Sequence, residues 1–310
     1  MSRPFRFATQ TGPFHDASQL RVRAQEIEAF GYEELYSSDH IGMAAGLNSV
    51  DPFVALIIAA EATTTLRVGP LVLNNEFHQP ALLARTVISV DQMTQGRLVL
   101  GMGTGYAQAE HEAIGVRLRA PGPRVTRFGE SLQVLRELCD IGSCTFDGDH
   151  HQIDISELGI RPVQQRIPFL IGGHGRRVVS LAGQHADIFQ FTGLTHAADG
   201  TPSGGGFGIE QIRERAAWLT EAAGNRNDVI ERSALVQVAA VGAAAHAEAM
   251  ATERLAHYAD VIDDTPFILS GSLEQIIDKI ERLRRDLLIS HFVVRDAEGF
   301  APVVAALAGK

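Results

Sequence analysis

The sequence predicts an α/β fold, a parallel (β/α)8 TIM barrel. Short apolar runs alternate with longer helical patterns along the chain, and eight of these runs have the length and composition of strands. Parallel strands need helical crossovers, so this alternation favours a parallel sheet covered by helices. With 310 residues, 45% of them hydrophobic, the chain can fill one such barrel, and we expect residues 1–310 to form a single domain. A doubly wound open sheet is the alternative.

The eight predicted strands are short apolar runs. They are Arg6–Gln10, Glu34–Ser38, Arg67–Asn74, Arg97–Gly103, Pro168–Gly172, Ala186–Phe191, Ala234–Val241 and Ser290–Arg295.

The helices between the strands carry recognisable end signals. Asp51-Pro52 is typical of an N-cap followed by a proline in the first turn, and Ser272-Leu-Glu-Gln275 matches a capping box. Gly31 and Gly224 each follow the last residue of a helical pattern, where glycine favours a helix end.

Two stretches do not fit the plain repeat, and we expect them to be insertions after strands 4 and 6. Gly142–Leu158 is predicted to be a small hairpin with a turn at Asp147-Gly148. Thr192–Gly208 is rich in glycine and polar residues and is predicted to be a mobile loop over the carboxyl ends of the strands, where long loops are often lids.

Charge and composition argue against several classes of protein. The net charge of −10 and a pI near 5.6 disfavour a partner that is a nucleic acid or an anionic membrane. The spacing of Cys139 and Cys144 matches no zinc or redox motif, and both are typical of reduced thiols. The amino-terminal residues lack the apolar core of a signal peptide. The apolar run Phe53–Ala60 is too short to span a membrane. We expect a cytoplasmic protein.

Polar residues follow the second and third strands, at the barrel end where chemistry takes place. Asp39 and His40 can hydrogen-bond a polar heterocycle and move a proton near neutral pH, or they cap a turn beside a surface histidine. Asn74 and Asn75 offer amides suited to the imide edge of a ring, or they form a turn.

Glycines follow the fourth strand. Gly101, Gly103 and Gly105 allow the backbone to approach a ligand closely, and their spacing is Gly-x-Gly-x-Gly. A Rossmann site would need Gly-x-Gly-x-x-Gly and, about 20 positions later, an acidic residue at the end of a second strand. The stretch RAPGPRVTRFGESL offers no such strand, so an NAD-dependent Rossmann dehydrogenase is disfavoured.

The stretch after the fifth strand, Gly172-Gly173-His174-Gly175-Arg176, opens a helical pattern. A glycine-rich turn at a helix start exposes backbone N–H groups beside the positive end of the helix dipole, which is typical of a phosphate site. A tight turn that needs glycine for its dihedral angles explains the same residues.

No metal site is expected. The first strand lacks a His-x-His pair, the other histidines are scattered, and no Gly-x-Ser-x-Gly nucleophile elbow occurs.

Taken together, three stretches resemble the bacterial luciferase-like monooxygenase superfamily, and more narrowly its branch that uses the deazaflavin coenzyme F420. They are YSSDHIG, the block from Val68 to Val116, and PFLIGGHGRRVVSLAGQHADIFQF. The most specific part is the long pattern H-x-P-A-x-x-A-x-x-x-x-x-x-D-x-x-x-x-G-R-x-x-L-G-x-G-x-G, and the resemblance covers most of the chain.

The resemblance implies a (β/α)8 barrel with a flavin-type ring at the strand ends. It also implies a bulge in the third strand near Leu71–Leu73, often with a non-proline cis peptide, that supports the ring from behind. It implies that Asp39 and His40 contact the ring edge and the catalytic side, that Thr104 and Gly105 lie near the ribityl chain, and that the helix start after Gly172 cradles the phosphate. We therefore expect cofactor contacts from Asp39, Asn74, Asn75, Gly103, Thr104, Gly105, Gly172, Gly173, His174, Gly175 and Arg176.

One residue departs from the sugar-phosphate dehydrogenases of this family. Tyr106 stands where those enzymes have a glutamate acid/base after the Thr-Gly pair. Glucose-6-phosphate oxidation by that mechanism is therefore not expected. Tyr106 either donates a proton or forms a wall of the pocket, and because an unperturbed tyrosine is a poor acid at neutral pH, His40 is the predicted proton-transfer residue.

The resemblance implies an F420-dependent oxidoreductase that transfers a hydride between the deazaflavin and an organic substrate with an activated C=C or C=N bond. The substrate would be a small molecule or a modified peptide, in secondary or peptide metabolism, and relatives are commonly homodimers. The alternatives are an FMN-dependent monooxygenase that uses reduced flavin and oxygen, and a non-catalytic cofactor-binding protein. The oligoglutamate tail of F420 would need a local basic groove, and the linear sequence reveals none.

Overall fold

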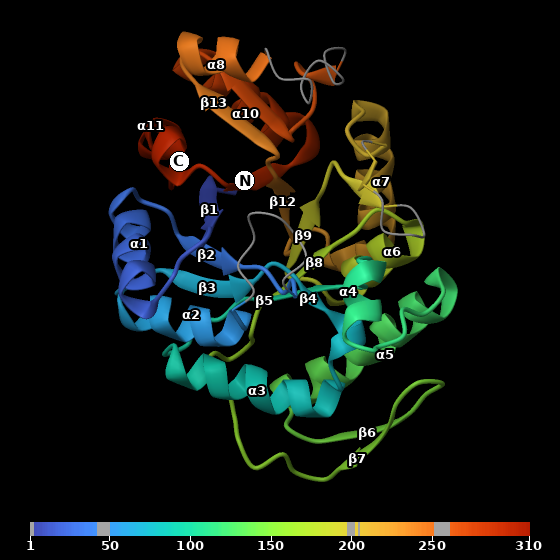
Figure 1. The fold of residues 1–310 in the computed structure, drawn as a ribbon. Coiled ribbons are helices and arrows are strands. Elements are labelled where there is room, and N and C mark those ends of the chain that lie inside the picture. The colour runs from blue at the N-terminus through green and yellow to red at the C-terminus, as the bar shows by residue number, and fades with distance from the viewer. Residues whose placement is uncertain (1–2, 42–49, 197–201, 204, 251–260) are drawn as a thin grey trace.

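The computed structural model describes residues 3–41, 50–196, 202–203, 205–250 and 261–310. In this part of the chain, eight parallel strands form a barrel that is surrounded by helices (Figure 1). They are β1 (Arg6–Gln10), β2 (Glu34–Ser37), β3 (Arg67–Pro70), β5 (Leu100–Gly103), β8 (Phe169–Gly172), β9 (Ile188–Phe191), β12 (Glu231–Leu235) and β15 (Ile289–Val294). A bridge between Val68 and Leu98 joins the two edges of the sheet, which confirms the predicted barrel.

The helices lie outside the barrel, and the predicted end signals at Gly31, Asp51, Gly224 and Ser272 stand at helix ends. They are α1 (Ala17–Ala29), α2 (Pro52–Glu61), α3 (Pro80–Met93), α4 (Gln108–Ala113), α5 (Pro121–Asp140), α6 (Arg176–His185), α7 (Ile209–Ala223), α8 (Ala243–Met250), α10 (Leu273–Leu287) and α11 (Ala297–Leu307). Asp51 caps α2 through the N–H groups of Phe53 and Val54, and Ser272 and Gln275 form the predicted capping box of α10. Their apolar faces pack on the barrel in one large core.

The third strand is not one continuous run, so the prediction of Arg67–Asn74 as a single strand is wrong. The strand breaks after Pro70, a cis peptide joins Leu71 to Val72, and the pairing resumes as β4 (Leu73–Asn74) beside β5. The interruption and its non-proline cis peptide lie where the family resemblance implies a bulge, near Leu71–Leu73.

The seventh strand is also displaced from its predicted position. The barrel strand is β12, whereas most of the predicted run Ala234–Val241 forms β13 (Val238–Val241), which pairs with β14 (Ile268–Gly271) in a separate two-stranded sheet. The apolar pattern missed the start of β12 because Glu231, Arg232 and Ser233 are polar yet buried, with partners from other strands and helices. This small sheet, with α8, is a third insertion that the sequence did not predict.

The two predicted insertions are present. The hairpin comprises β6 (Cys144–Asp147) and β7 (Gln152–Ile155), at the lower edge of Figure 1. Its loop is wider than the predicted two-residue turn, because Glu130 of α5 accepts hydrogen bonds from the N–H groups of residues 149–151. Within residues 192–208, the structure describes a short ribbon, β10 (Thr195–His196) and β11 (Pro202–Ser203); the rest of the predicted mobile loop, residues 197–201 and 204, lies outside the described residues.

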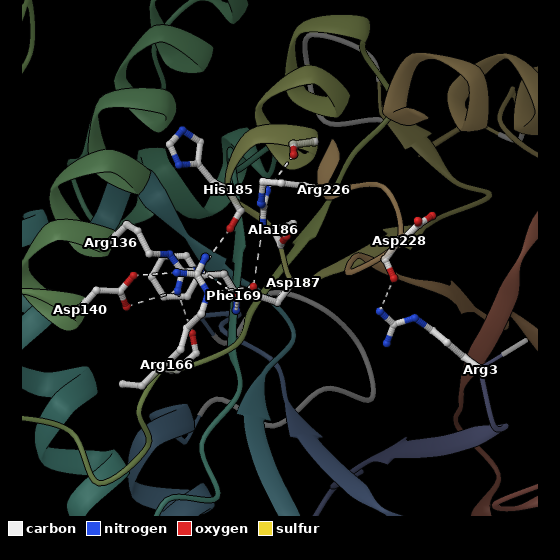
Figure 2. Close-up of polar contacts among 12 residues, drawn as sticks. Arg3, Arg136, Asp140, Arg166, Phe169, His185, Ala186, Asp187, Arg226 and Asp228 are labelled. Atoms are coloured by element: carbon white, nitrogen blue, oxygen red, sulfur yellow. Dashed lines mark hydrogen bonds and ion pairs between the residues drawn. The ribbon is translucent and has the colours of Figure 1, made fainter. Parts of the chain in front are cut away.

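Ion pairs outside the barrel fasten α5 to the amino ends of β8 and β9. The carboxylate of Asp187 accepts hydrogen bonds from Arg136 at 2.9 Å, from Arg166 at 3.0 Å and from the N–H of Phe169 at 2.9 Å (Figure 2). The guanidinium of Arg136 also lies 3.5 Å from the centroid of the Phe169 ring, a cation–π contact. This network holds two neighbouring strands of the barrel in place.

Every second residue of a barrel strand points inward, and these inward side chains form three layers in the barrel interior. The layer at the amino ends is charged and contains Arg6, Glu34, Glu231 and His291. The middle layer is a separate apolar cluster that includes Ala8, Tyr36, Leu170 and Val293. The third layer, at the carboxyl ends, includes Gln10, Gln190 and Arg295 and faces a cavity.

Candidate functional site

A cavity of about 440 Å³ lies at the carboxyl ends of the barrel strands. Residues at or after the end of every barrel strand line it, from Gln10 after β1 to Arg295 after β15. Its volume is in the range of small-molecule sites, roughly 300–1,000 Å³. Leu71, Val72 and Leu235 contribute apolar surface, and they pack on the middle layer of the barrel interior.

Most of the predicted site residues line this cavity. They are His40, Tyr106, Asp39, Asn74, Gly103, Thr104, Gly105, Gly172, Gly173, His174 and Gly175. Two others lie elsewhere. Asn75 is buried in the short helix η1 (Asn75–Phe77), where its carbonyl accepts a hydrogen bond from Arg127. The exposed Arg176 forms an ion pair at 3.1 Å with Glu221 of α7.

His40 is held between a carboxylate and a phenol. Its Nδ1 lies 2.6 Å from Oε1 of Glu110, and its Nε2 lies 3.3 Å from the hydroxyl of Tyr106. The carboxylate can only accept, so Nδ1 carries a proton and donates it, and Nε2 is then the nitrogen that accepts from Tyr106. The arrangement orients the basic nitrogen of His40 toward the cavity side.

Tyr106 is the outer member of this group. Burial raises the pKa of its hydroxyl, Glu110 raises it further, and Arg295 opposes both effects. Tyr106 is therefore a donor to His40 at neutral pH and not a source of phenolate.

Glu110 supplies a carboxylate that the sequence argument did not find. It lies on α4, four residues after Tyr106, and its side chain is 6% exposed. Its partner His40 is 70 residues away, so no local sequence signal pointed to it. The cavity therefore contains a carboxylate although Tyr106, and not a glutamate, follows the Thr-Gly pair.

Asn74 and Asp39 form the wall beside His40. Asp39 accepts a hydrogen bond from the N–H of Asn74 at 2.9 Å. The Asn74 amide donates to His111 at 2.9 Å and accepts from the N–H of Glu76 at 3.0 Å. Gly105 packs against this amide with φ +78°, and a Cβ there would lie 2.1 Å from Oδ1 of Asn74, so only glycine fits.

The start of α6 forms the opposite side of the cavity. Gly175 is its N-cap, and no side chain caps the helix there. A Cβ built at Gly175 would meet nothing within 4 Å, so open space lies over the first turn. Backbone N–H groups at such a helix start, together with the helix dipole, attract an anion. The predicted phosphate cradle therefore has room and donors for a phosphate-bearing cofactor.

His174 connects this cradle to the segment after β9. Arg215 of α7 donates to its Nδ1 at 2.9 Å, so the other nitrogen, Nε2, donates to the carbonyl of Leu194. Arg215 also donates to the carbonyls of Thr192 and Gly206, one near each end of the segment. Sequence reasoning missed Arg215 because it is 41 residues from His174.

The described residues hold no group of three or more His, Cys, Asp or Glu side chains placed to bind a metal ion. None of the helices in the described ranges has the length and apolarity to cross a membrane.

Comparison with known proteins identifies relatives in one family. The model of the luciferase-like monooxygenase family matches residues 2–265. The chain is 28% identical over 169 residues to 5,10-methylenetetrahydromethanopterin reductase from Archaeoglobus fulgidus. The aligned region covers 54% of this chain and 47% of the relative. It is 29% identical over 185 residues to F420-dependent glucose-6-phosphate dehydrogenase from Amycolatopsis mediterranei, and this aligned region covers 59% of this chain and 54% of the relative. The chain thus spans about half the length of these relatives.

Solved structures share the fold at low sequence identity. The F420-dependent tetrahydromethanopterin reductase from Methanopyrus kandleri superposes with a TM-score of 0.71 at 18% identity, over 97% of both chains. The EDTA monooxygenase from Chelativorans sp. BNC1 superposes with a TM-score of 0.77 at 14% identity, over 98% of this chain and 94% of that one. These structures confirm the TIM-barrel fold. Since the family model matches most of the chain, the protein belongs to the luciferase-like monooxygenase family.

Proposed function

We propose that this member of the luciferase-like family is an F420-dependent oxidoreductase, which transfers a hydride between the deazaflavin and an organic substrate with an activated C=C or C=N bond. One observation carries the proposal: a single cavity joins a proton-transfer histidine to an uncapped helix start that suits a phosphate. The relatives named as F420-dependent glucose-6-phosphate dehydrogenases support this cofactor.

The residues present fit the cofactor at both ends. The first turn of α6, behind Gly173 and Gly175, would hold the phosphate. Asp39 and Thr104 would contact the polar parts, and Leu71 and Val72 offer apolar surface for the ring. When bound, the deazaflavin supplies the hydride-transfer chemistry, and the protein supplies binding and orientation.

His40 moves the proton that accompanies the hydride. Glu110 holds the proton of Nδ1, so Nε2 is the nitrogen that exchanges a proton with the substrate, once the substrate replaces the Tyr106 hydroxyl beside it. The carboxylate stabilises the imidazolium that forms when Nε2 takes a proton. In the direction of substrate reduction, the same Nε2–H donates the proton.

Several finer points belong to the same proposal. The substrate is a small molecule or a modified peptide, the chain acts as a homodimer in the cytoplasm, and residues 1–310 work as one domain. Similarity to enzymes that act on small molecules supports a small-molecule substrate.

An FMN-dependent monooxygenase is the second candidate, because solved relatives of the same fold include monooxygenases. Equilibrium binding separates the two. The purified protein is titrated with F420 and, separately, with FMN, and the fluorescence of each cofactor is followed. Tight F420 binding with weak FMN binding supports the proposal. The opposite preference, with oxygen consumed when reduced FMN is supplied, overturns it. Binding of F420 without turnover on any unsaturated substrate identifies a non-catalytic binding protein instead.

A further inference from the structure

A second hollow opens beside the cavity. It has a volume of about 630 Å³ and lies between α4 and the segment that leads into α5. We call it the arginine groove, because Arg117, Arg119 and Arg124 line it. Arg124 also lines the cavity at the strand ends, so the two hollows share a wall.

The arginine groove is locally basic in a chain with a net charge of −10. Among its lining residues, Glu112 is the acidic one, and its carboxylate accepts a hydrogen bond from Gln108 at 2.7 Å. Arg117 is exposed, and Arg119 reaches Glu76 at 2.8 Å while its side chain stays 39% exposed. Three guanidinium groups therefore line the groove together with the carboxylate of Glu112, while Glu76, outside the lining, pairs with Arg119.

One N–H group of Arg124 has no hydrogen-bond acceptor in the protein. Its Nε is buried and has no hydrogen-bond partner, and its Nη1 donates to the carbonyl of Arg119 at 3.3 Å. Arg124 lies in the first turns of α5, which begins at Pro121 without a side-chain cap. The guanidinium and the positive helix end thus attract an anion at the same place.

The groove begins where the phosphate cradle ends. Arg177 of α6 donates to the carbonyl of Gly122 at 3.2 Å and to the hydroxyl of Thr126 at 3.0 Å. These bonds place the amino ends of α5 and α6 side by side. A flexible chain attached to a phosphate at Gly175 would therefore pass Arg124 as it leaves the cavity.

We propose that the arginine groove binds a flexible chain of carboxylates that emerges from the cavity, and that this chain is the oligoglutamate tail of the cofactor. The inference rests on the proposed function, since it takes F420 as the occupant of the cavity. The arginine groove is the local basic groove that the linear sequence does not reveal. Residues 117, 119 and 124 are brought together by the turn between α4 and α5.

The test is a fluorescence titration with F420 of defined tail lengths and with the form that has no glutamate. For the wild-type protein at low salt, we expect affinity to rise with each glutamate and to level off by the third, because three arginines line the groove. The double variant Arg117→Gln/Arg124→Gln should lose about tenfold in affinity for the long-tailed cofactor. Its loss for the tail-less form should be smaller, although Arg124 also borders the cavity. High salt should reduce the advantage of the tail in the wild type.

Two further variants keep the result interpretable. Arg117→Gln alone changes an exposed side chain, so it should leave the fold intact and lose about threefold for the long tail. Arg213→Gln, on α7 and paired with Glu210, is the matched control that should lose nothing.

Each contrary outcome points to a different failure. Equal wild-type affinity for long-tailed and tail-less F420 overturns the groove proposal and leaves the proposed function standing. An equal loss of affinity for the tail-less and the long-tailed form in Arg117→Gln/Arg124→Gln assigns the arginines to the phosphate and also overturns the groove proposal. A raised KM for an acidic substrate with unchanged tail dependence assigns the groove to the substrate. No binding of any form of F420 defeats the proposed function itself.

Discussion

At the amino ends of the barrel strands, Arg6 lies among Glu33, Glu34 and Glu231, whereas at the carboxyl ends His40 lies between Glu110 and Tyr106. In the first group the charged side chains fill the space between the strands and bond to one another. In the second, the polar atoms surround a cavity of about 440 Å³. Buried charge alone therefore does not mark a functional site in this protein; the open volume beside it does.

The two histidines of these regions show the same contrast. His291 is completely buried, with Nε2 3.3 Å from Glu34, and burial lowers its pKa despite that carboxylate. His40 has a closer carboxylate, at 2.6 Å, and its side chain is 22% exposed to the cavity. A histidine that serves chemistry needs a path to a substrate, and only the second has one.

The largest effect should come from removing the central charge of the amino-end group. Arg6→Met leaves Glu231 buried without its cation and leaves Glu34 with only Arg67, at 3.5 Å, so the free energy of unfolding should fall by roughly 3–5 kcal/mol. Urea denaturation measures this loss, and Arg213→Ala at an exposed ion pair should cost less than about 1 kcal/mol. A loss for Arg6→Met as small as for Arg213→Ala would mean that the charged layer does not support the fold.

Replacing His40, at the carboxyl ends of the barrel strands, should lower the reaction rate and leave stability nearly unchanged. His40→Asn takes away the proton-transfer nitrogen, so kcat should fall by roughly 10²- to 10⁴-fold. The free energy of unfolding should stay within about 1 kcal/mol of wild type, since the side chain borders a cavity. Stopped-flow measurement of F420 absorbance gives the first quantity and urea denaturation the second. Near-normal turnover would remove His40 from the mechanism.

The pH dependence of stability should report on Glu34. Burial alone would raise its pKa, but Arg6, His291 and Arg67 outweigh burial and lower it from 4.5 to about 2. The folded protein then binds this proton more weakly than the unfolded chain does. The stabilisation is complete above pH 4.5 and is lost as the pH falls toward 2, by about 3 kcal/mol.

Urea denaturation at pH 7, 4.5 and 2.5 checks this dependence against Glu34→Gln, whose profile should be flatter below pH 4.5. His151 and His185, whose pKa values burial lowers to about 4, affect both proteins equally and cancel in the difference. Parallel profiles for the two proteins would contradict the assignment to Glu34.

The smallest effect should come from Glu110→Gln. The amide can still contact Nδ1 of His40 but no longer stabilises the imidazolium, so kcat should fall about tenfold. The Kd for F420 and the free energy of unfolding should not change. An equal loss in cofactor affinity would indicate that Glu110 shapes the pocket and does not support His40.

The parts of the fold that depend on local pattern were predictable, and those that depend on distant contacts were not. The caps at Asp51 and Ser272 need only neighbouring residues, and they form as expected. The start of β12 was missed because Glu231 is stabilised by Arg6, 225 residues away. In the site, Asp39 and His40 were found from their place after a strand, but Glu110 was missed because its partner is 70 residues away.

Arg215 has a consequence for how the site can diversify. One guanidinium binds the carbonyl of Thr192 at one end of a segment and that of Gly206 at the other, as well as His174 beside the cradle. The sequence between these anchors can change in length and composition without displacing the anchors or the start of α6. On the proposed function, such a segment lets substrate choice change while the residues that would hold the cofactor keep their positions.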